Sequence, residues 1–213
     1  MENTRLTRAY LEYGRPDRQY HFAYGTLLSP ACLKSLGVEP AVPAVAELRG
    51  HALCFSGESA AACGGLETVL ARDGSSVWGA VYELRFREAL ALDAAFGARL
   101  DGCGKRFHFP VEVADLSGGS HRCLAYKLCQ AGRPAPPSRE RLELIVSGAE
   151  ARGLPAGYID GLRNRPSRRQ AAGAPALLPP GPVSPGSLGD FPCAGCGGGP
   201  LRFGPPPPPE IPS

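Results

Sequence analysis

The sequence predicts an α+β fold: a single domain with a mixed, curled, barrel-like sheet and peripheral helices, followed by a disordered tail rich in proline and glycine. Several short runs alternate polar and apolar residues at the period of a strand, and a few segments have helical spacing. From Pro166 onward this periodicity stops, and such a segment buries too little apolar surface to offset its ordering entropy. We therefore expect a flexible arm at residues 1–17, a compact domain at 18–165 and a disordered tail at 166–213.

Composition and charge narrow the classes of protein. With 213 residues, 43% of them apolar, the chain can bury one sizeable core. The net charge of +3 is too small to indicate nucleic-acid binding, and no basic stripe interleaved with aromatics is present. No apolar run approaches the roughly 18 residues of a membrane span, and the N-terminus lacks a signal-peptide core. The sequence thus predicts a cytoplasmic protein without a nucleic-acid or membrane partner.

The cysteines indicate reduced thiols. Six of the eight lie among apolar neighbours, as is typical of core thiols in a reducing compartment: Cys32, Cys54, Cys63, Cys103, Cys123 and Cys129. The remaining two form Cys193-Ala-Gly-Cys196, and a zinc ribbon needs a second ligand pair that does not follow. We therefore expect this motif to lie in the flexible tail without a metal.

The first element is a strand that stops at a glycine and restarts as a helix. Aromatic residues alternate along 20–24, and Ser29 is a predicted N-cap with Pro30 as the first helical residue. The helix is expected to end at Gly37. Between strand and helix, residues 25–28 form a turn whose backbone N–H groups suit a carboxylate or another anion. The alternative is an ordinary tight turn without a ligand.

The middle of the chain predicts three strands and one helix. Residues 46–54 alternate as a half-buried strand, and 64–70 and 77–84 are two further strands. Residues 73–76 have the composition of a hairpin turn between the latter two. Helical spacing follows over 87–100 and is interrupted by Gly102 and Gly104.

The last elements are a hairpin and two helices. Residues 107–113 and 122–128 alternate on either side of a Ser-Gly-Gly-Ser turn, and Pro110 indicates an edge or a bulge. Ser138 is expected to cap a helix that runs to about Arg152 and ends at Gly153. Pro155 then opens a short helix through Leu162.

Several motifs together resemble the gamma-glutamylcyclotransferase family. The opening Phe-Ala-Tyr-Gly-Thr-Leu-Leu at residues 22–28 is similar to the family's Tyr-Gly loop. The other matching pieces follow in the family's order and at similar spacing: Gly64-Gly-Leu66, Val77-Trp-Gly-Ala-Val81, Tyr126, Ala135-Pro-Pro-Ser138, Gly148-Ala-Glu-Ala-Arg-Gly-Leu-Pro155 and Tyr158. The resemblance covers the whole predicted domain.

The resemblance implies a reaction without metal or cofactor. The α-amino group of a small gamma-glutamyl substrate attacks its own side-chain carbonyl, which yields 5-oxoproline and releases an amine or amino acid. Holding the substrate folded supplies much of the rate advantage of such an intramolecular step. A base must accept the ammonium proton and return it to the leaving nitrogen. By resemblance, the substrate-binding residues are Tyr24, Gly25, Thr26, Leu27, Leu28 and Tyr126.

The sequence departs from the family at the catalytic glutamate. Counting forward from Trp78 places Phe96 at the glutamate position, whereas counting backward from Val113 places Asp101 there. The two counts differ by five residues, which implies an insertion between 96 and 107. Phenylalanine cannot move a proton, so Asp101 is a catalytic candidate, with a helix-end residue in a glycine-rich turn as the alternative.

Three further side chains enter the list of proton acceptors. Glu67 follows the Gly64-Gly65 pair in a strand, with a solvated strand residue as the alternative. His108 is a further possible base because the unperturbed pKa of histidine lies near neutrality. Asp93 matches an aspartate that is not catalytic in the family. For Tyr126, the alternative to substrate contact is a buried tyrosine anchored by its ring.

Two functions therefore stay open. The chain is either a gamma-glutamylcyclotransferase or a catalytically silent relative that binds gamma-glutamyl ligands or acts through its tail. The run Pro205–Pro209 suits a polyproline II ligand for an SH3- or WW-type partner, with a solvated tail as the alternative. No feature of the sequence sets the oligomeric state.

Overall fold

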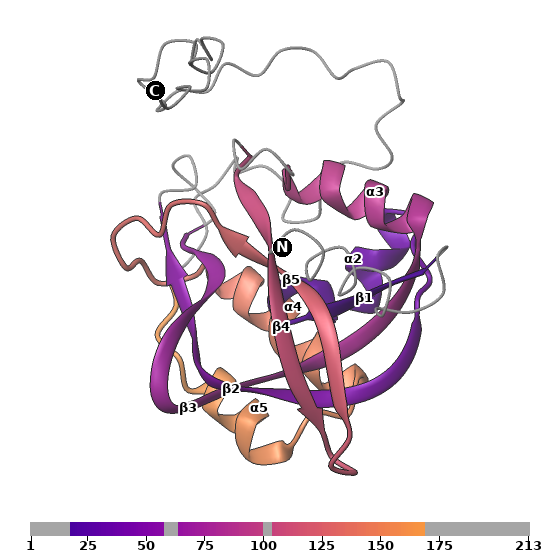
Figure 1. Cartoon of the computed structure of the whole chain (residues 1–213). Helices are drawn as coiled ribbons and strands as arrows, with labels where there is room; N and C mark the ends of the chain where they lie inside the picture. The colour runs from indigo at the N-terminus through magenta and orange to yellow at the C-terminus, as the bar shows by residue number, and fades with distance from the viewer. Residues whose placement is uncertain (1–17, 58–63, 100–103, 169–213) are drawn as a thin grey trace, which may run out of the picture.

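The computed structural model describes residues 18–57, 64–99 and 104–168. In this part of the chain, five strands close into a barrel in the order β1-β3-β2-β4-β5 (Figure 1). Strand β1 spans Arg18–Ala23 and runs antiparallel to β3. The barrel closes where β1 meets β5 in parallel, at His21 and Leu124. The sheet is therefore mixed and curled, which confirms the predicted fold class.

Strands β2 and β3 form one long ribbon around the barrel. Strand β2 spans Ala41–Ser56 and β3 spans Leu66–Arg85. The predicted hairpin at 73–76 is wrong, because the residues on both sides of it pair with β2 in a single strand. Residues 72–75 bulge outward opposite Gly50, between the pairs Arg49–Ser76 and His51–Ala71. A bulge and a hairpin turn both use glycine at positive φ, here Gly74 at 71°, so composition alone does not separate them.

The helices begin at the predicted caps. Helix α2 spans Pro30–Ser35, and the Ser29 hydroxyl accepts from the Cys32 amide. Helix α4 spans Arg139–Ala151, and the Ser138 hydroxyl accepts from the Arg141 amide at 3.2 Å. Helix α5 follows over Ala156–Arg163. These caps satisfy first-turn N–H groups that would otherwise lack partners.

Helix α3 is shorter than the sequence predicts. It spans Phe86–Phe96 and ends at Gly97, whose φ of 63° lies in the left-handed region. A left-handed glycine is a common helix stop because it has no Cβ to clash. The predicted end near residue 100 is therefore wrong by about one turn, and Phe96 becomes the last helical residue.

Strands β4 and β5 form the predicted hairpin. Strand β4 spans Arg106–Asp115, β5 spans Ser120–Leu128, and the two pair along most of their length. Strand β4 meets β2 at Ala114 and Asp115. Pro110 lies further along β4, where no strand pairs on its other side in the described chain, which confirms the predicted edge position.

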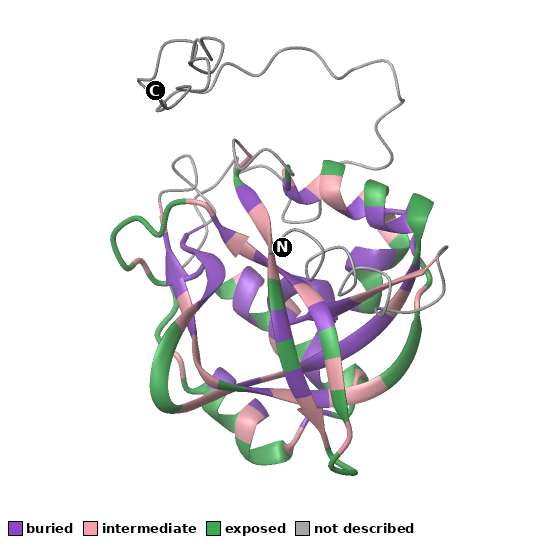
Figure 2. Cartoon of the chain, viewed as in Figure 1, coloured by how far each residue is buried: buried purple, intermediate pink, exposed green. Residues whose placement is uncertain are grey.

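Helix α4 packs directly on the turn that follows β1. Buried side chains form a continuous core between the sheet and these elements (Figure 2). Gly148 of α4 allows the close approach, since a Cβ there would lie 2.6 Å from the Ser29 amide nitrogen and 2.7 Å from the Leu28 carbonyl carbon. The position of α4 therefore depends on a residue without a side chain.

A second close approach joins the start of β3 to the segment before α4. The Gly65 amide donates to the Pro136 carbonyl at 2.9 Å, and the Ala135 amide donates to the Phe55 carbonyl at 3.1 Å. A Cβ on Gly65 would lie only 2.2 Å from the Ala135 carbonyl oxygen. The Gly64-Gly65 pair therefore sets the distance between β3 and the start of α4.

The four cysteines in the described part of the chain are free thiols: Cys32, Cys54, Cys123 and Cys129. The predicted arm at 1–17, most of the tail, Cys63, Cys103, the Cys193–Cys196 motif and Pro205–Pro209 lie outside the described residues. The domain boundaries and the SH3- or WW-type partner therefore stay predictions. No helix of the described residues is long and apolar enough to span a membrane.

Gly148→Ala should destabilise the domain. The new methyl group would collide with the backbone of residues 28 and 29, so we expect a loss of about 1–3 kcal/mol in the free energy of unfolding. Gly161→Ala is the matched control, because no atom lies within 4 Å of a Cβ at that position of α5. The control should gain about 0.5–1 kcal/mol, since alanine is the better helix former. Urea denaturation followed by circular dichroism measures both, and equal effects of the two changes would contradict the packing argument.

Candidate functional site

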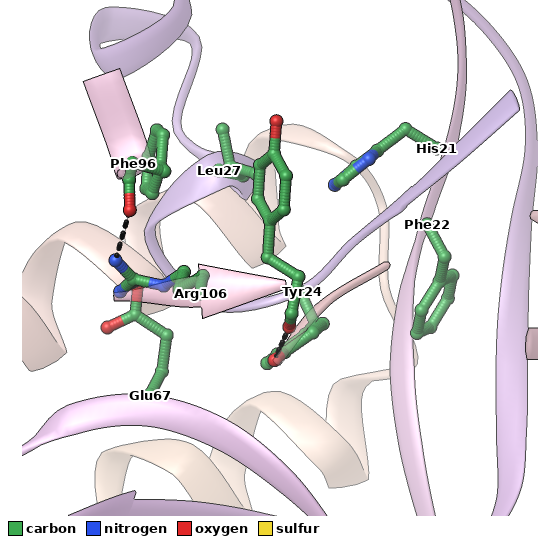
Figure 3. Close-up of a pocket in the computed structure, with 8 residues that line it drawn as sticks. His21, Phe22, Tyr24, Leu27, Glu67, Phe96 and Arg106 are labelled. Carbon is green, nitrogen blue, oxygen red and sulfur yellow. Dashed lines mark hydrogen bonds and ion pairs between the residues drawn. The ribbon is translucent and has the colours of Figure 1, made fainter. Parts of the chain in front are cut away.

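A pocket lies where β1, the turn after it, α3 and the β4–β5 hairpin meet (Figure 3). Residues from six elements line it: His21, Phe22, Tyr24, Leu27, Glu67, Phe96, Arg106 and Tyr126. The free space between these side chains is about that of one water molecule. A larger ligand therefore enters only if a side chain of the lining moves.

The turn at the base of the pocket is a buried 3-10 helix, η1, over Gly25–Leu28. Each of its last three carbonyls has a donor inside the protein. The Thr26 carbonyl accepts from the Ser29 amide at 3.1 Å, and the Leu27 carbonyl accepts from the Tyr82 hydroxyl at 2.9 Å. The Leu28 carbonyl accepts from Arg152 Nε at 3.2 Å. These bonds fix the turn, and Gly25 at φ 71° provides the left-handed residue at its start.

Glu67 places a carboxylate directly over this turn. Its Oε1 accepts from the Thr26 hydroxyl at 2.6 Å, and its Oε2 accepts from Arg141 Nη1 at 2.9 Å. Arg106 Nη2 lies 3.7 Å from Oε1. Burial alone would raise the pKa of Glu67, but Arg141, Arg106 and the Thr26 hydroxyl outweigh it and lower the pKa to about 2. Glu67 is therefore a buried, ionised residue, and the alternative of a solvated strand residue is wrong.

Phe96 presents its ring to the pocket from the end of α3. The ring stacks against Tyr126 with centroids 5.8 Å apart, and the Arg106 guanidinium carbon lies 5.3 Å from the Phe96 centroid. Arg106 Nη1 donates to the Phe96 carbonyl at 3.2 Å, so the guanidinium lies between Phe96 and Glu67 (Figure 3). Asp101, the other candidate for the glutamate position, lies outside the described residues.

Tyr126 connects the pocket to a polar group beside it. Its hydroxyl donates to Asp93 Oδ1 at 2.5 Å, and its carbonyl accepts from the Tyr24 hydroxyl. His108 Nε2 lies 3.1 Å from the same Asp93 carboxylate. Burial and the Asp93 charge raise the pKa of Tyr126 well above its usual value, so the phenol stays protonated and donates.

His21 lies in the pocket with both ring nitrogens unpartnered among the described residues. The side chain is 1% exposed, and its ring lies 4.5 Å from that of Tyr126 between centroids. Burial and the nearby His108 lower the pKa of His21 to about 3, so the ring is neutral at pH 7. A neutral imidazole offers one donor and one acceptor to whatever enters the pocket.

The structure brings most of the predicted site residues together. Tyr24, Leu27, Glu67, Phe96 and Tyr126 line one pocket, and Gly25, Thr26 and Leu28 form the buried turn behind it. Sequence analysis did not anticipate His21, Arg106 or Arg141. The alternating pattern of the first strand gives His21 a fixed side of the sheet, and this was the one sequence signal for it. No local pattern indicates that the two arginines contact Glu67.

The described residues contain no group of three or more His, Cys, Asp or Glu side chains arranged to hold a metal ion. The charged side chains that reach the pocket are instead one glutamate and one arginine, with a second arginine bonded to the glutamate. The pocket therefore offers hydrogen bonds and ionic contacts to a small polar ligand.

Comparisons with known proteins agree on one family. Residues 76–162 match the model of the AIG2-like family. The chain is 28% identical over 154 residues to the gamma-glutamylcyclotransferase of Homo sapiens, a match that covers 70% of this chain and 80% of that protein. It is 26% identical over 144 residues to the Bos taurus protein of the same name, covering 65% and 73% of the two chains.

Solved structures add the fold over a similar length. A structure named gamma-glutamyl cyclotransferase superposes with a TM-score of 0.65 at 27% identity, covering 75% of this chain and 94% of that chain. An uncharacterized protein from Homo sapiens superposes with a TM-score of 0.68 at 25% identity, covering 76% and 96%. Sequence motifs, barrel topology and these matches agree, and the chain is similar over most of its described domain to gamma-glutamylcyclotransferases and to the AIG2-like family.

Proposed function

We propose that the chain cyclises small gamma-glutamyl compounds to 5-oxoproline in the pocket beside η1. The observation that carries the proposal is the joint placement of the Tyr24–Leu28 turn and Tyr126 at one pocket, in a fold similar to proteins named gamma-glutamylcyclotransferase. In the reaction, the α-amine forms a new C–N bond with the side-chain carbonyl while the old amide C–N bond breaks. The proton lost by the amine passes to the leaving nitrogen. The step requires no cofactor, and we propose that it takes place in the cytoplasm, as the sequence predicts.

The pocket suits the polar head of such a substrate. Arg106 supplies a buried positive charge for a carboxylate, and neutral His21 supplies a hydrogen-bond acceptor for an amine. Both side chains are buried, and electrostatic interactions are stronger in a protein interior than in solution. Orientation of the amine toward the carbonyl accounts for much of the expected rate, because the step is intramolecular.

The proton acceptor is the open part of this mechanism. Glu67 is unsuited to it, because two arginines and a hydroxyl hold the carboxylate and a pKa of about 2 makes it a weak base. We propose two acceptors, Asp101 and His108. Asp101 belongs to the segment between Arg99 and Gly104, which joins Phe96 to Arg106, and both of these residues line the pocket.

His108 is supported by its contacts in the described chain. An Nε2–H donated to Asp93 leaves the Nδ1 lone pair to accept a proton, and Nδ1 is buried without a partner among the described residues. The His108 ring lies 5.4 Å from the Tyr126 ring between centroids, next to the pocket. Asp93 then acts as a positioning residue that sets the tautomer of His108.

One observation favours a second candidate, a relative that binds gamma-glutamyl compounds without turning them over. Phe96 carries no proton, and its ring lines the pocket together with Tyr126. A pocket that keeps the binding groups but lacks a base retains affinity and loses rate. Variants that remove or add a base separate the two candidates.

The direct test of the enzyme is release of 5-oxoproline from gamma-glutamyl-alanine by the full chain. Asp101→Asn or His108→Gln should lower kcat by about 100- to 10,000-fold, whichever residue is the acceptor, because a general base contributes that much. Asp73→Asn and His51→Gln are the matched controls, since neither residue lines the pocket, and both should leave kcat unchanged. An active wild type that tolerates both test variants would remove Asp101 and His108 from the mechanism, and an inactive wild type would favour the second candidate.

Phe96→Glu tests whether the pocket is a cyclotransferase site that lacks its base. The new carboxylate would lie in the pocket at the position that the forward count gives to the family's glutamate, and should raise 5-oxoproline formation by about 100-fold or more. Phe96→Gln is the control, because glutamine has the same length and cannot accept a proton at neutral pH. A folded Phe96→Glu variant with no more activity than Phe96→Gln would show that the reacting bond does not lie beside residue 96.

A further inference from the structure

Glu67, Arg106 and Arg141 form a buried cluster with more positive than negative charge. Their side chains are 5%, 7% and 9% exposed, so solvent screens them little. Each arginine reaches the same carboxylate, Arg141 at 2.9 Å and Arg106 at 3.7 Å. One carboxylate therefore faces two guanidinium groups, and the Arg106 contact is longer than a hydrogen bond.

Unused hydrogen-bonding groups lie in the same place. Arg141 Nε is buried and has no partner among the described residues, and the same holds for both nitrogens of His21 in the pocket. Buried polar groups without partners are costly and rare in folded proteins. The cluster thus has donors for more acceptor oxygens than Glu67 provides.

The Glu67 carboxylate lies where the sequence predicts that the carboxylate of a ligand binds. The side chain crosses the η1 turn against Gly25, where a Cβ would lie 2.4 Å from Glu67 Cγ. Its end then lies at the Thr26 hydroxyl, on the turn whose sequence predicts a carboxylate site. The carboxylate comes from Glu67 near the start of β3, and the guanidinium that it contacts comes from Arg141 in the first turn of α4.

We propose that Arg106, Arg141 and the Thr26 hydroxyl form a binding site for a small carboxylate, and that Glu67 occupies this site when no ligand is bound. An incoming carboxylate replaces Glu67 one for one, so the charge of the arginine pair stays balanced throughout. The exchange also provides the room that the pocket lacks, because Glu67 is one of its lining residues. The proposal concerns binding alone and stands whether or not the bound compound reacts.

Glu67→Gln tests this competition without an activity assay. The variant removes the internal carboxylate and leaves two buried arginines unbalanced, which should lower its melting temperature in chloride buffer. Acetate or 5-oxoproline at equal ionic strength should restore the melting temperature, and titration calorimetry should give a Kd at least about tenfold lower than for the wild type. Wild-type protein should respond weakly, because Glu67 competes.

Glu88→Gln is the matched control. Glu88 is also a buried glutamate, but it accepts from the Arg85 amide at the start of α3 and does not line the pocket. This variant should lose stability with no recovery in acetate. Equal recovery of both variants, or equal acetate affinity of wild type and Glu67→Gln, would overturn the proposal.

A variant that does not fold in chloride still gives an answer. Glu67→Gln should then refold when acetate is present in the refolding buffer, and failure in both buffers would count against the site. Glu67→Asp provides a second reading, because its carboxylate is one methylene shorter and holds Arg141 less well. It should bind acetate with an affinity between those of wild type and Glu67→Gln, and an affinity no greater than wild type would contradict the competition.

Discussion

The turn Gly25–Leu28 is buried, so its carbonyls need hydrogen-bond donors from the protein. Two distant parts of the chain supply donors: β3 through the Tyr82 hydroxyl, and the end of α4 through Arg152 Nε. Gly148 of α4 allows the close approach, because it has no side chain. The barrel and α4 are thereby fixed relative to each other at this point. The pocket inherits that rigidity, since the same turn forms its base.

The sequence predicted the fold well where the signals are local. Ser29 and Ser138 cap helices because a side-chain oxygen accepts from an amide three residues on, and such a contact is visible in a short window. The hairpin predicted at 73–76 failed for the opposite reason. Whether Gly74 belongs to a hairpin turn or a bulge depends on β2, whose residues Arg49 and His51 pair on either side of it and lie more than twenty residues earlier in the sequence.

The site divides in the same way. Tyr24–Leu28 and Tyr126 were predicted from motifs, and they lie together at the pocket. Glu67 was predicted as a candidate, but its environment was not, because Arg141 is 74 residues from it in sequence. Sequence analysis missed Arg106 and His21 for a similar reason. Each becomes a pocket residue only because it is buried, and its burial depends on elements that are distant in sequence. The local sequence around each residue does not indicate this burial.

The Gly64-Gly65 pair has a consequence for how such a site changes in evolution. At this pair, β3 is joined to the segment before α4 by a backbone hydrogen bond, which the Gly65 amide donates to the Pro136 carbonyl. A joint made of main chain does not depend on which side chains surround it. Residues that line the pocket, such as Phe96, can therefore be replaced in evolution while the fold is kept. A fold of this kind can lose one catalytic activity and gain another in evolution, because the variants along the way still fold.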